Sequence, residues 1–485
     1  MSRNRISGRP ATLAALAAVA AAAAGCATNP ATGESMLAFM SEGQEVQAGQ
    51  EFKLQVAAQQ GIYEDAALNA YVDSVGQALA AVSERPELPW SFQVVDDPVV
   101  NAFALPGGPI FLARGILAHF NSEAQMASVL GHEIGHITAR HIVEAMSRQQ
   151  LAQLGLIAGM IAVPDLAPYA QELSGAMGVL FLKFGRDDES QSDELGHRYM
   201  TRAGYDPEAA VAMFEILERQ RAVSGQSMPE WTSTHPDPGN RVAAARERAA
   251  TDTIEGGIVR RDEYLRRIDG LVWGPDPREG YFLDERFVHP ELAFEVTLPQ
   301  GWQTANTKQA VLAGSPDKDA MFQLSAGQAQ PDEAARTFFG GQGIRQTGSA
   351  RRTIHGLPAI VATFAAQAQS GAIEGIAAFI RHGDLTYQLL GYAPSSRIGR
   401  HAATLERTIG SFAPVTDRSL LRVEPMRIDV VRVPERMTAR RFYERYPSTV
   451  ELEIVLQVNG VDADDTIQAG TRMKRITGTG GPTGR

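Results

Sequence analysis

Hydrophobic residues in the first part of the chain recur mainly at the spacing of amphipathic helices. Residues 42–60 are rich in Gln, Glu and Ala with scattered apolar positions, and this pattern predicts a helix. A second helix is predicted where apolar residues follow three- and four-residue intervals, at Leu68, Tyr71, Val72, Val75 and Leu79. Pro86 and Pro89 end this helical section.

Short apolar runs then predict a small sheet followed by another helix. Residues 91–96 have the composition of a strand, and the runs 101–105 and 109–114 are joined by Pro-Gly-Gly, which is typical of a hairpin. The next helix is predicted to begin at Ser122, a favourable N-cap residue. Gln125, three positions later, completes a capping box.

Residues 150–182 are unusually apolar, but Pro164 and Pro168 interrupt them, so they are too broken to span a membrane. We interpret them as helices in a domain core. The alternative is a mobile apolar flap over the functional site or against lipid. Beyond them, an acidic stretch is patterned as a helix that runs through Met200.

The second half of the chain has a different pattern of residues, with more strand-like runs. Gly and Pro residues within 271–277 suggest a linker, and residues 281–415 alternate strand-like runs with one or two helices. A third unit at 425–478 runs strand, helix, apolar segment, Asn-Gly turn and strand. The fold class is therefore α+β, with a mainly helical domain and small sheet over 41–270 followed by two smaller units.

The N-terminus predicts a bacterial lipoprotein signal peptide over residues 1–25, followed by a lipid-anchored tether over 26–40. An Arg-rich leader precedes an apolar run that ends in Gly25-Cys26. This junction resembles a lipobox, although Ala23 stands where Leu is more usual. The alternative is an ordinary cleaved signal peptide.

Cysteine usage supports lipid attachment at Cys26. It is the single cysteine of the chain, so no internal disulfide can form. Attachment of a lipid would explain why an exported protein carries one unpaired cysteine. Ala27 is not the Asp that commonly retains lipoproteins at the inner membrane. We therefore expect the periplasmic side of the bacterial outer membrane, in preference to the inner membrane.

Composition excludes some classes of protein. A 44% apolar and 21% charged chain is an ordinary globular protein, neither disordered nor a multi-span membrane protein. The net charge of −11, without a basic stripe, argues against nucleic acid as a partner.

The most informative motif is His-Glu-Ile-Gly-His at residues 132–136. Positions i and i+4 share a helix face, so His132 and His136 can bind one metal ion. Glu133 is placed to take a proton from a metal-bound water. The alternative is two histidines that merely cap or pack on a helix.

A catalytic zinc site needs three protein ligands and an open position. Glu189 and Asp193 lie at i and i+4 of the acidic helix, so Glu189 can supply the third ligand and Asp193 can orient a ligand imidazole. Asp187, Asp188 and Glu194 are alternative ligands. Asp187 and Asp188 also suit the helix dipole at a helix start.

Several ordered motifs together resemble one family. They are the His-Glu-Ile-Gly-His run, the apolar stretch after it, Arg-Asp-x-Glu-x-x-x-Asp, Gly-Tyr-Asp-Pro and Thr-His-Pro. The combination, over about residues 35–250, is similar to the HtpX and CAAX-prenyl-protease family of zinc metallopeptidases (gluzincins), within it the periplasmic BepA/LoiP-type lipoproteins. The resemblance implies a zincin-type metalloprotease domain, one Zn²⁺ per chain and Glu189 as third ligand. Ser192 replaces the Ala that is usual there.

His235, in the Thr-His-Pro loop, is a further candidate. A His before Pro in a polar loop is commonly just solvated, but the resemblance supports a role near zinc. It can cap the open position at rest, as a latch, or stabilise the oxyanion. Arg241 is expected to orient this loop. His119, His141 and His197 lie off the ligand face by spacing, and we interpret them as structural.

Two further resemblances concern partners. The strand 109–114 resembles the edge strand on which such proteases align an extended peptide, and Asn101 and Ala102 can line the same cleft. Residues 428–476 resemble a LysM-like domain, which implies contact with peptidoglycan.

The leading hypothesis is a zinc-dependent endopeptidase, lipid-anchored in the periplasm, that cleaves misfolded or misassembled envelope proteins with a water activated by Glu133. This would serve outer-membrane protein quality control. The alternative is an envelope assembly or peptidoglycan-binding factor with a latched protease site. A deacylase or peptidoglycan-peptide hydrolase is a third reading, because zinc chemistry alone does not choose the substrate.

Overall fold

The computed structural model describes residues 26–162, 184–223, 235, 240–368 and 371–481. They divide into two compact units. Unit 1 contains the described residues up to Leu271 together with Ile428–Ile476, and unit 2 contains Val272–Arg427 and the residues from Thr477 onward. Both units combine helices with sheets, which confirms the α+β class.

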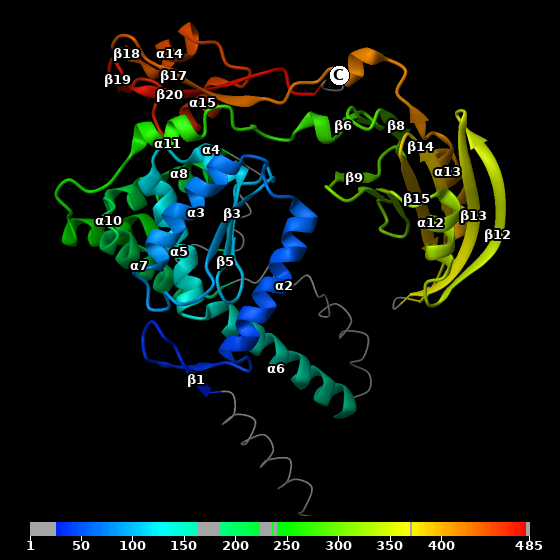
Figure 1. Ribbon diagram of the computed structural model, residues 1–485, viewed down its shortest axis with the longest axis horizontal. Helices are drawn as coiled ribbons and strands as arrows, with labels where there is room; N and C mark the ends of the chain where they lie inside the picture. The colour runs from blue at the N-terminus through cyan, green and yellow to red at the C-terminus, as the bar shows by residue number, and fades with distance from the viewer. Residues whose placement is uncertain (1–25, 163–183, 224–234, 236–239, 369–370, 482–485) are drawn as a thin grey trace, which may run out of the picture. The chain divides into compact units, whose positions relative to one another are not determined.

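Unit 1 is built around helix α5 (Glu123–Thr138), which lies among other helices and a small sheet (Figure 1). Helices α3 (Ala66–Ala80), α7 (Arg186–Arg202) and α8 (Glu208–Val223) pack against it. Within α5 every residue except Ser128 is buried. Its histidines and glutamates must therefore find partners inside the fold.

The start of α5 agrees with the sequence, with one difference. Ser122 Oγ accepts a hydrogen bond from the Gln125 backbone N–H at 3.2 Å, as expected of an N-cap. Gln125 Oε1, however, accepts from the backbone N–H of Asn121 at 2.5 Å. In the expected capping box the Gln125 side chain would accept from the N–H of Ser122, whereas here it accepts from the residue before it.

The sheet of unit 1 corrects one expectation. Strands β3 (Ser91–Val95), β4 (Ala102–Ala104) and β5 (Pro109–Ala113) confirm the predicted strand and hairpin. Their order is β3-β5-β4, so β5 pairs with a strand on each side. The prediction that 109–114 is an edge strand is wrong, because both of its hydrogen-bonding edges are used within the sheet. The terminal strand on that side is β4, which contains Ala102.

Helices α5 and α7 cross at unusually short range because small residues line their contact. A Cβ on Gly131 would lie 3.0 Å from the carbonyl oxygen of Gly196, and one on Gly196 would lie 2.8 Å from the backbone nitrogen of His132. A Cβ on Gly135 would lie 3.1 Å from Cα of Ser192. This approach lets short side chains on the two helices meet.

The C-terminal stretch of unit 1 runs strand, helix, helix, strand. These elements are β17 (Arg427–Arg432), α14 (Ala439–Arg445), α15 (Leu452–Asn459) and β20 (Arg472–Thr477), with β17 paired to β20 and short strands β18 (Met437–Thr438) and β19 (Thr466–Ile467) between them. The predicted apolar segment is helix α15. The LysM-like assignment, and the boundary of a separate domain at 425–478, stay predictions.

This stretch is joined to the rest of unit 1 by buried polar contacts. Lys474 is buried, and its Nζ donates to the carbonyl oxygens of Ala118 and Phe120, each at 2.8 Å, where helix α4 (Arg114–His119) ends. Asn121 Nδ2 donates to the carbonyl of Val458 at 3.1 Å. Residues 428–476 therefore pack against the segment between α4 and α5 and hold it in place.

The N-terminal segment forms a hairpin. Strand β1 (Cys26–Thr28) pairs with β2 (Ser35–Leu37), and Met36 and Ala38 pack against Val143 of helix α6 (His141–Ala162). Helix α2 (Glu42–Gln60) follows as predicted. The predicted signal peptide, residues 1–25, lies outside the described residues. So does most of the apolar stretch 150–182, from residue 163 onward.

Unit 2 confirms a second α+β assembly. Its main sheet is antiparallel, in the order β12-β13-β14-β15-β11-β10-β9. The strands are β9 (Gln303–Asn306), β10 (Val311–Gly314), β11 (Met321–Gly327), β12 (Ile344–Ile354), β13 (Leu357–Ala368), β14 (Gly371–His382) and β15 (Leu385–Pro394). A smaller sheet has the order β16-β8-β7-β6, with β6 (Tyr281–Leu283), β7 (Arg286–His289), β8 (Phe294–Thr297) and β16 (Ala413–Pro414).

Two helices cover opposite faces of the main sheet. Alternate residues of β14 belong to different apolar clusters: Ile376, Ala378 and Ile380 pack with Leu405 of α13 (Ile398–Gly410). Ala377 and Phe379 pack with α12 (Pro331–Phe339). Because successive residues of a strand point to opposite faces, β14 is buried on both sides.

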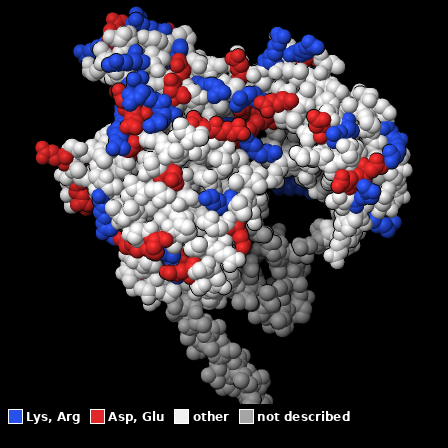
Figure 2. Space-filling view, in the orientation of Figure 1, with Lys and Arg blue, Asp and Glu red and all other residues white. Residues whose placement is uncertain are grey.

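Charged side chains of both signs lie on the described surface. On the face shown in Figure 2, acidic and basic side chains of the described residues are interspersed and form no continuous basic stripe. Of the helices in the described part of the chain, none is both long and apolar enough to cross a membrane.

The close crossing of α5 and α7 is testable by adding one methyl group. We expect Gly196→Ala to lower the free energy of unfolding of unit 1 by about 1–3 kcal/mol, because its Cβ would press on the α5 backbone. Chemical denaturation of the purified chain measures this. Gly43→Ala in α2 is the matched control, since its Cβ would meet nothing within 4 Å. Equal stability of both variants would contradict the crossing.

Candidate metal centre

Helices α5 and α7 bring the predicted ligands together in a buried group. His132 Nε2 lies 3.0 Å from His136 Nε2. Glu189 of α7 places one carboxylate oxygen 3.5 Å from His132 Nε2 and the other 3.5 Å from His136 Nε2. All three side chains are at most 4% exposed. The i, i+4 spacing on α5 and the short interhelical distance together create this geometry.

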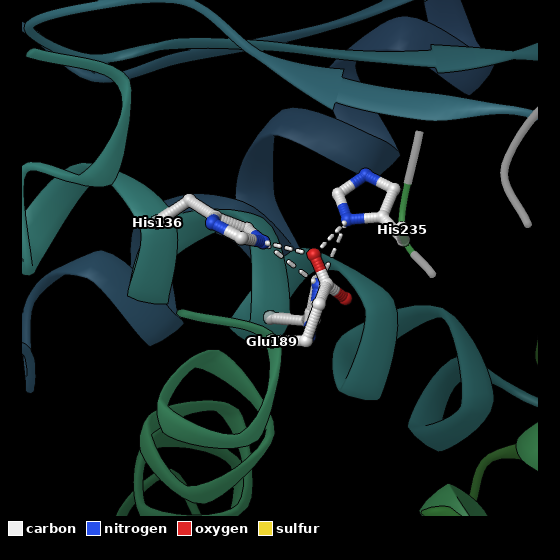
Figure 3. A group of neighbouring side chains, drawn as sticks. His136, Glu189 and His235 are labelled. Atoms are coloured by element: carbon white, nitrogen blue, oxygen red, sulfur yellow. Dashed lines mark hydrogen bonds and ion pairs between the residues drawn. The ribbon is translucent and has the colours of Figure 1, made fainter. Parts of the chain in front are cut away.

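His235, which lies between α8 and α10 (Arg241–Thr251) in the sequence, joins the same group. Its Nδ1 lies 3.0 Å from Glu189 Oε1 and 3.3 Å from His132 Nε2. Figure 3 shows His136, Glu189 and His235 pointing toward one another. One ligand atom from each of His132, His136, Glu189 and His235 lies within 4.8 Å of the others.

The group has the chemistry of a metal site. Among the described residues, Glu133 Oε1 and Glu189 Oε2 are buried carboxylate oxygens without a hydrogen-bond donor. Buried charges need a compensating partner, and three imidazoles with one carboxylate form a typical ligand set for a transition metal. The residues present therefore fit a metal cofactor.

Asp193 orients His132 and is itself held firmly. Its Oδ1 accepts from His132 Nδ1 at 2.9 Å, which leaves Nε2 to face the cluster. Arg241, at the start of α10 (Arg241–Thr251), donates to both Asp193 oxygens, at 2.6 and 2.9 Å. Burial alone would raise the pKa of Asp193, but the Arg241 charge and His132 lower it to about 2. Arg241, expected to orient the His235 loop, thus contacts the acidic side chain behind the cluster.

The electrostatic environment keeps Glu189 ionised. Burial opposes its charge, yet His235, His136 and His132 hold the pKa of Glu189 below its usual range. Burial lowers the pKa of His136 well below its ordinary value, which favours a neutral ring. The pKa of His235 is raised despite burial, because Glu189 and Glu133 lie beside it.

Other candidates lie outside the cluster. Asp188 Oδ2 accepts from the backbone N–H of Gly185 at the start of α7, and Glu194 pairs with Arg198. His197 Nε2 contacts Asp252 at 3.0 Å, away from the ligands. For His119, burial and then the Lys474 charge lower the pKa to about 3.

Sequence reasoning missed two neighbours of His136. The Phe184 ring stacks on His136 with centroids 4.0 Å apart, and His141 Nδ1 lies 3.0 Å from His136 Nδ1. Helical spacing places His141 off the ligand face, but Arg140 has a left-handed φ of 59° between α5 and α6. The helix direction changes there, so that spacing does not apply. Glu45 and the carbonyl of Met40 hold Arg140 in place.

Comparisons with known proteins agree with this geometry. The profile of Peptidase family M48 matches residues 66–249, which span α3 to α10 and the whole ligand cluster. Residues 66–249 are an M48 peptidase domain. This confirms the family resemblance found in the sequence.

Two relatives of the M48 domain extend the comparison. The beta-barrel assembly-enhancing protease of Escherichia coli (strain K12) is 33% identical over 231 residues, covering 46% of this chain and 47% of that protein. The mitochondrial metalloendopeptidase OMA1 of Arabidopsis thaliana is 37% identical over 168 residues, 34% of this chain and 33% of that protein. The chain thus spans about half or less of the length of these curated relatives.

The support of the M48 site by Arg241 can be tested through pH. A carboxyl with a lowered pKa in the folded state stabilises the fold above its ordinary pKa and loses this contribution as pH falls. For metal-free Arg241→Met we expect about 3–5 kcal/mol less stability near pH 7. The difference from wild type should shrink as pH falls toward 3, because in the variant Arg241 no longer lowers the pKa of Asp193 and this carboxyl is protonated at higher pH than in the wild type.

Urea unfolding in the presence of chelator, at several pH values, measures this difference. Arg246→Met is the matched control: it lies on the same helix and pairs with Glu215 at the surface, so its effect should stay within about 0.5 kcal/mol. A deficit in Arg241→Met that is constant across pH would contradict the role of Asp193.

Proposed function

We propose that the chain is a zinc-dependent endopeptidase, lipid-anchored through Cys26 in the periplasm, that cleaves misfolded or misassembled envelope proteins. The observation that carries the proposal is the buried group of His132, His136, Glu189 and His235 with Glu133 beside it. The protease and metalloendopeptidase names of the relatives support the reaction class. The name of the Escherichia coli protein supports an envelope substrate.

The side chains have separable tasks in peptide hydrolysis. Zinc, held by His132, His136 and Glu189, would polarise the scissile carbonyl and lower the pKa of a water molecule. Glu133 is 1% exposed, and its Oε1 lacks a hydrogen-bond donor in the described structure. It can therefore accept the proton of the attacking water and pass it to the leaving amine.

Strand β4 is suited to hold an extended substrate. The carbonyl of Asn101 and the N–H of Leu105 bond to β5, at 2.9 and 2.8 Å. Alternation along the strand then directs the backbone groups of Ala102 and Ala104 away from β5. Since β4 packs against α5, a peptide added at this edge would pass close to the metal ligands.

A second function is favoured by the position of His235. Its Nδ1 lies within hydrogen-bond distance of Glu189 and His132, and its Nε2 is 3.6 Å from Glu133 Oε1. A side chain so placed can act as a resting ligand and a latch. The alternative function is thus an envelope assembly or peptidoglycan-binding factor whose protease site is normally closed.

Replacing Glu133 separates metal binding from catalysis. We expect Glu133→Gln to keep its zinc but to lower casein cleavage by about 10²–10⁴-fold, because the amide cannot accept the proton. Chelator should abolish cleavage by wild type, and added zinc should restore it. Glu194→Gln, an exposed acid on α7, is the control and should cleave normally.

Cleavage that survives in Glu133→Gln or in chelator would contradict the endopeptidase mechanism. An intact envelope phenotype in cells that carry Glu133→Gln would instead favour the assembly function, because that function does not require proteolysis.

Replacing His235 distinguishes its two roles. If it is a resting ligand, His235→Ala should bind zinc at least about tenfold more weakly and cleave casein faster per bound zinc. Competition with a chromophoric chelator and initial rates at saturating zinc measure both quantities. Unchanged zinc affinity with a lower kcat would contradict the latch and favour oxyanion stabilisation.

A further inference from the structure

His141 lies behind the cluster and touches one of its ligands. It begins α6, is 3% exposed, and places Nδ1 3.0 Å from His136 Nδ1. Its other nitrogen, Nε2, lies 2.8 Å from Gln191 Oε1 on α7. The ring therefore bridges a ligand on α5 to a side chain on α7.

These two contacts fix the protons on both rings. The Gln191 amide oxygen can only accept, so a His141 ring with one proton carries it on Nε2 and has a bare Nδ1. That bare Nδ1 accepts from His136 Nδ1–H. His136 then has its lone pair on Nε2, the atom that faces His132 and Glu189.

We infer that His141 is a positioning residue, which fixes the tautomer and ring orientation of His136 as Asp193 does for His132. The inference rests on the proposed metal site. The neighbouring Ser192 is compatible with a bare Nδ1, because its Oγ lies 3.2 Å from the same His141 Nδ1 and a hydroxyl can donate.

The same hydrogen bonds continue to the segment that follows Cys26. Asn29 Nδ2 donates to Gln191 Oε1 at 3.2 Å, while Asn29 Oδ1 accepts from the backbone N–H of Ala31 at 2.9 Å. Asn29 is buried in the turn between β1 and β2. A continuous chain of contacts therefore joins the N-terminal hairpin to a metal ligand through Gln191 and His141.

Two substitutions of His141 test the acceptor role. His141→Phe keeps a ring but removes the acceptor, so we expect zinc affinity to fall by about 10–100-fold. In His141→Asn, the amide Oδ1 can replace Nδ1 as acceptor, so affinity should stay within about threefold of wild type. His197→Phe is the matched control, because His197 is also buried but bonds to Asp252.

The measurements use all 485 residues and free metal ions. Zinc affinity comes from competition with a chromophoric chelator, ligand geometry from the visible absorption of bound Co²⁺, and folding from thermal unfolding of the metal-free proteins. We expect an altered Co²⁺ spectrum in His141→Phe only. The inference is overturned if His141→Phe matches wild type, if His141→Asn is as weak as His141→Phe, or if His197→Phe loses as much affinity. Wild type that binds neither metal would instead overturn the proposed function.

Discussion

The approach of α5 to α7 is the constraint on which the rest of unit 1 depends. A carboxylate on one helix can reach two imidazoles on another only when the backbones nearly touch, and glycines at the crossing permit this. The same contact buries Asp193 and Ser192 between the helices. The helix crossing therefore sets both the ligand geometry and the supporting hydrogen bonds.

The cluster also depends on partners that arrive from distant parts of the sequence. Arg241 holds Asp193 from α10, and His235, six positions earlier in the sequence, contacts Glu189. His141 supports His136 from α6. Each ligand imidazole of α5 thus has its own partner at Nδ1, so both Nε2 atoms face the same point. These hydrogen bonds fix the orientation of the two imidazole rings, so that the pair can bind a metal ion in one geometry.

Local sequence patterns predicted much of this arrangement. The spacing of the apolar residues predicted helix α3, composition predicted α2, and Ser122 with Gln125 predicted the start of α5. The spacing of Glu189 and Asp193 placed both on one face of α7. Errors arose where a non-local contact or an irregular backbone decides the outcome. Helical spacing could not place His141 beyond the left-handed Arg140, and a hairpin pattern could not show that β3 pairs with the far side of β5. The fit of residues 428–476 into unit 1 depends on tertiary contacts alone.

The position of residues 428–476 late in the sequence affects when unit 1 can be completed during synthesis. The stretch that closes unit 1, residues 428–476, follows Val272–Arg427 of unit 2 in the sequence. Its contacts through Lys474 and Asn121 join segments more than three hundred residues apart. During synthesis the part of unit 1 that ends at Leu271 is therefore incomplete while Val272–Arg427 is made. An unfinished chain would then lack the buried contacts that secure the start of α5. The order of the segments thus delays the completion of unit 1, and of the buried group of metal-binding residues within it, until residues 428–476 have been made.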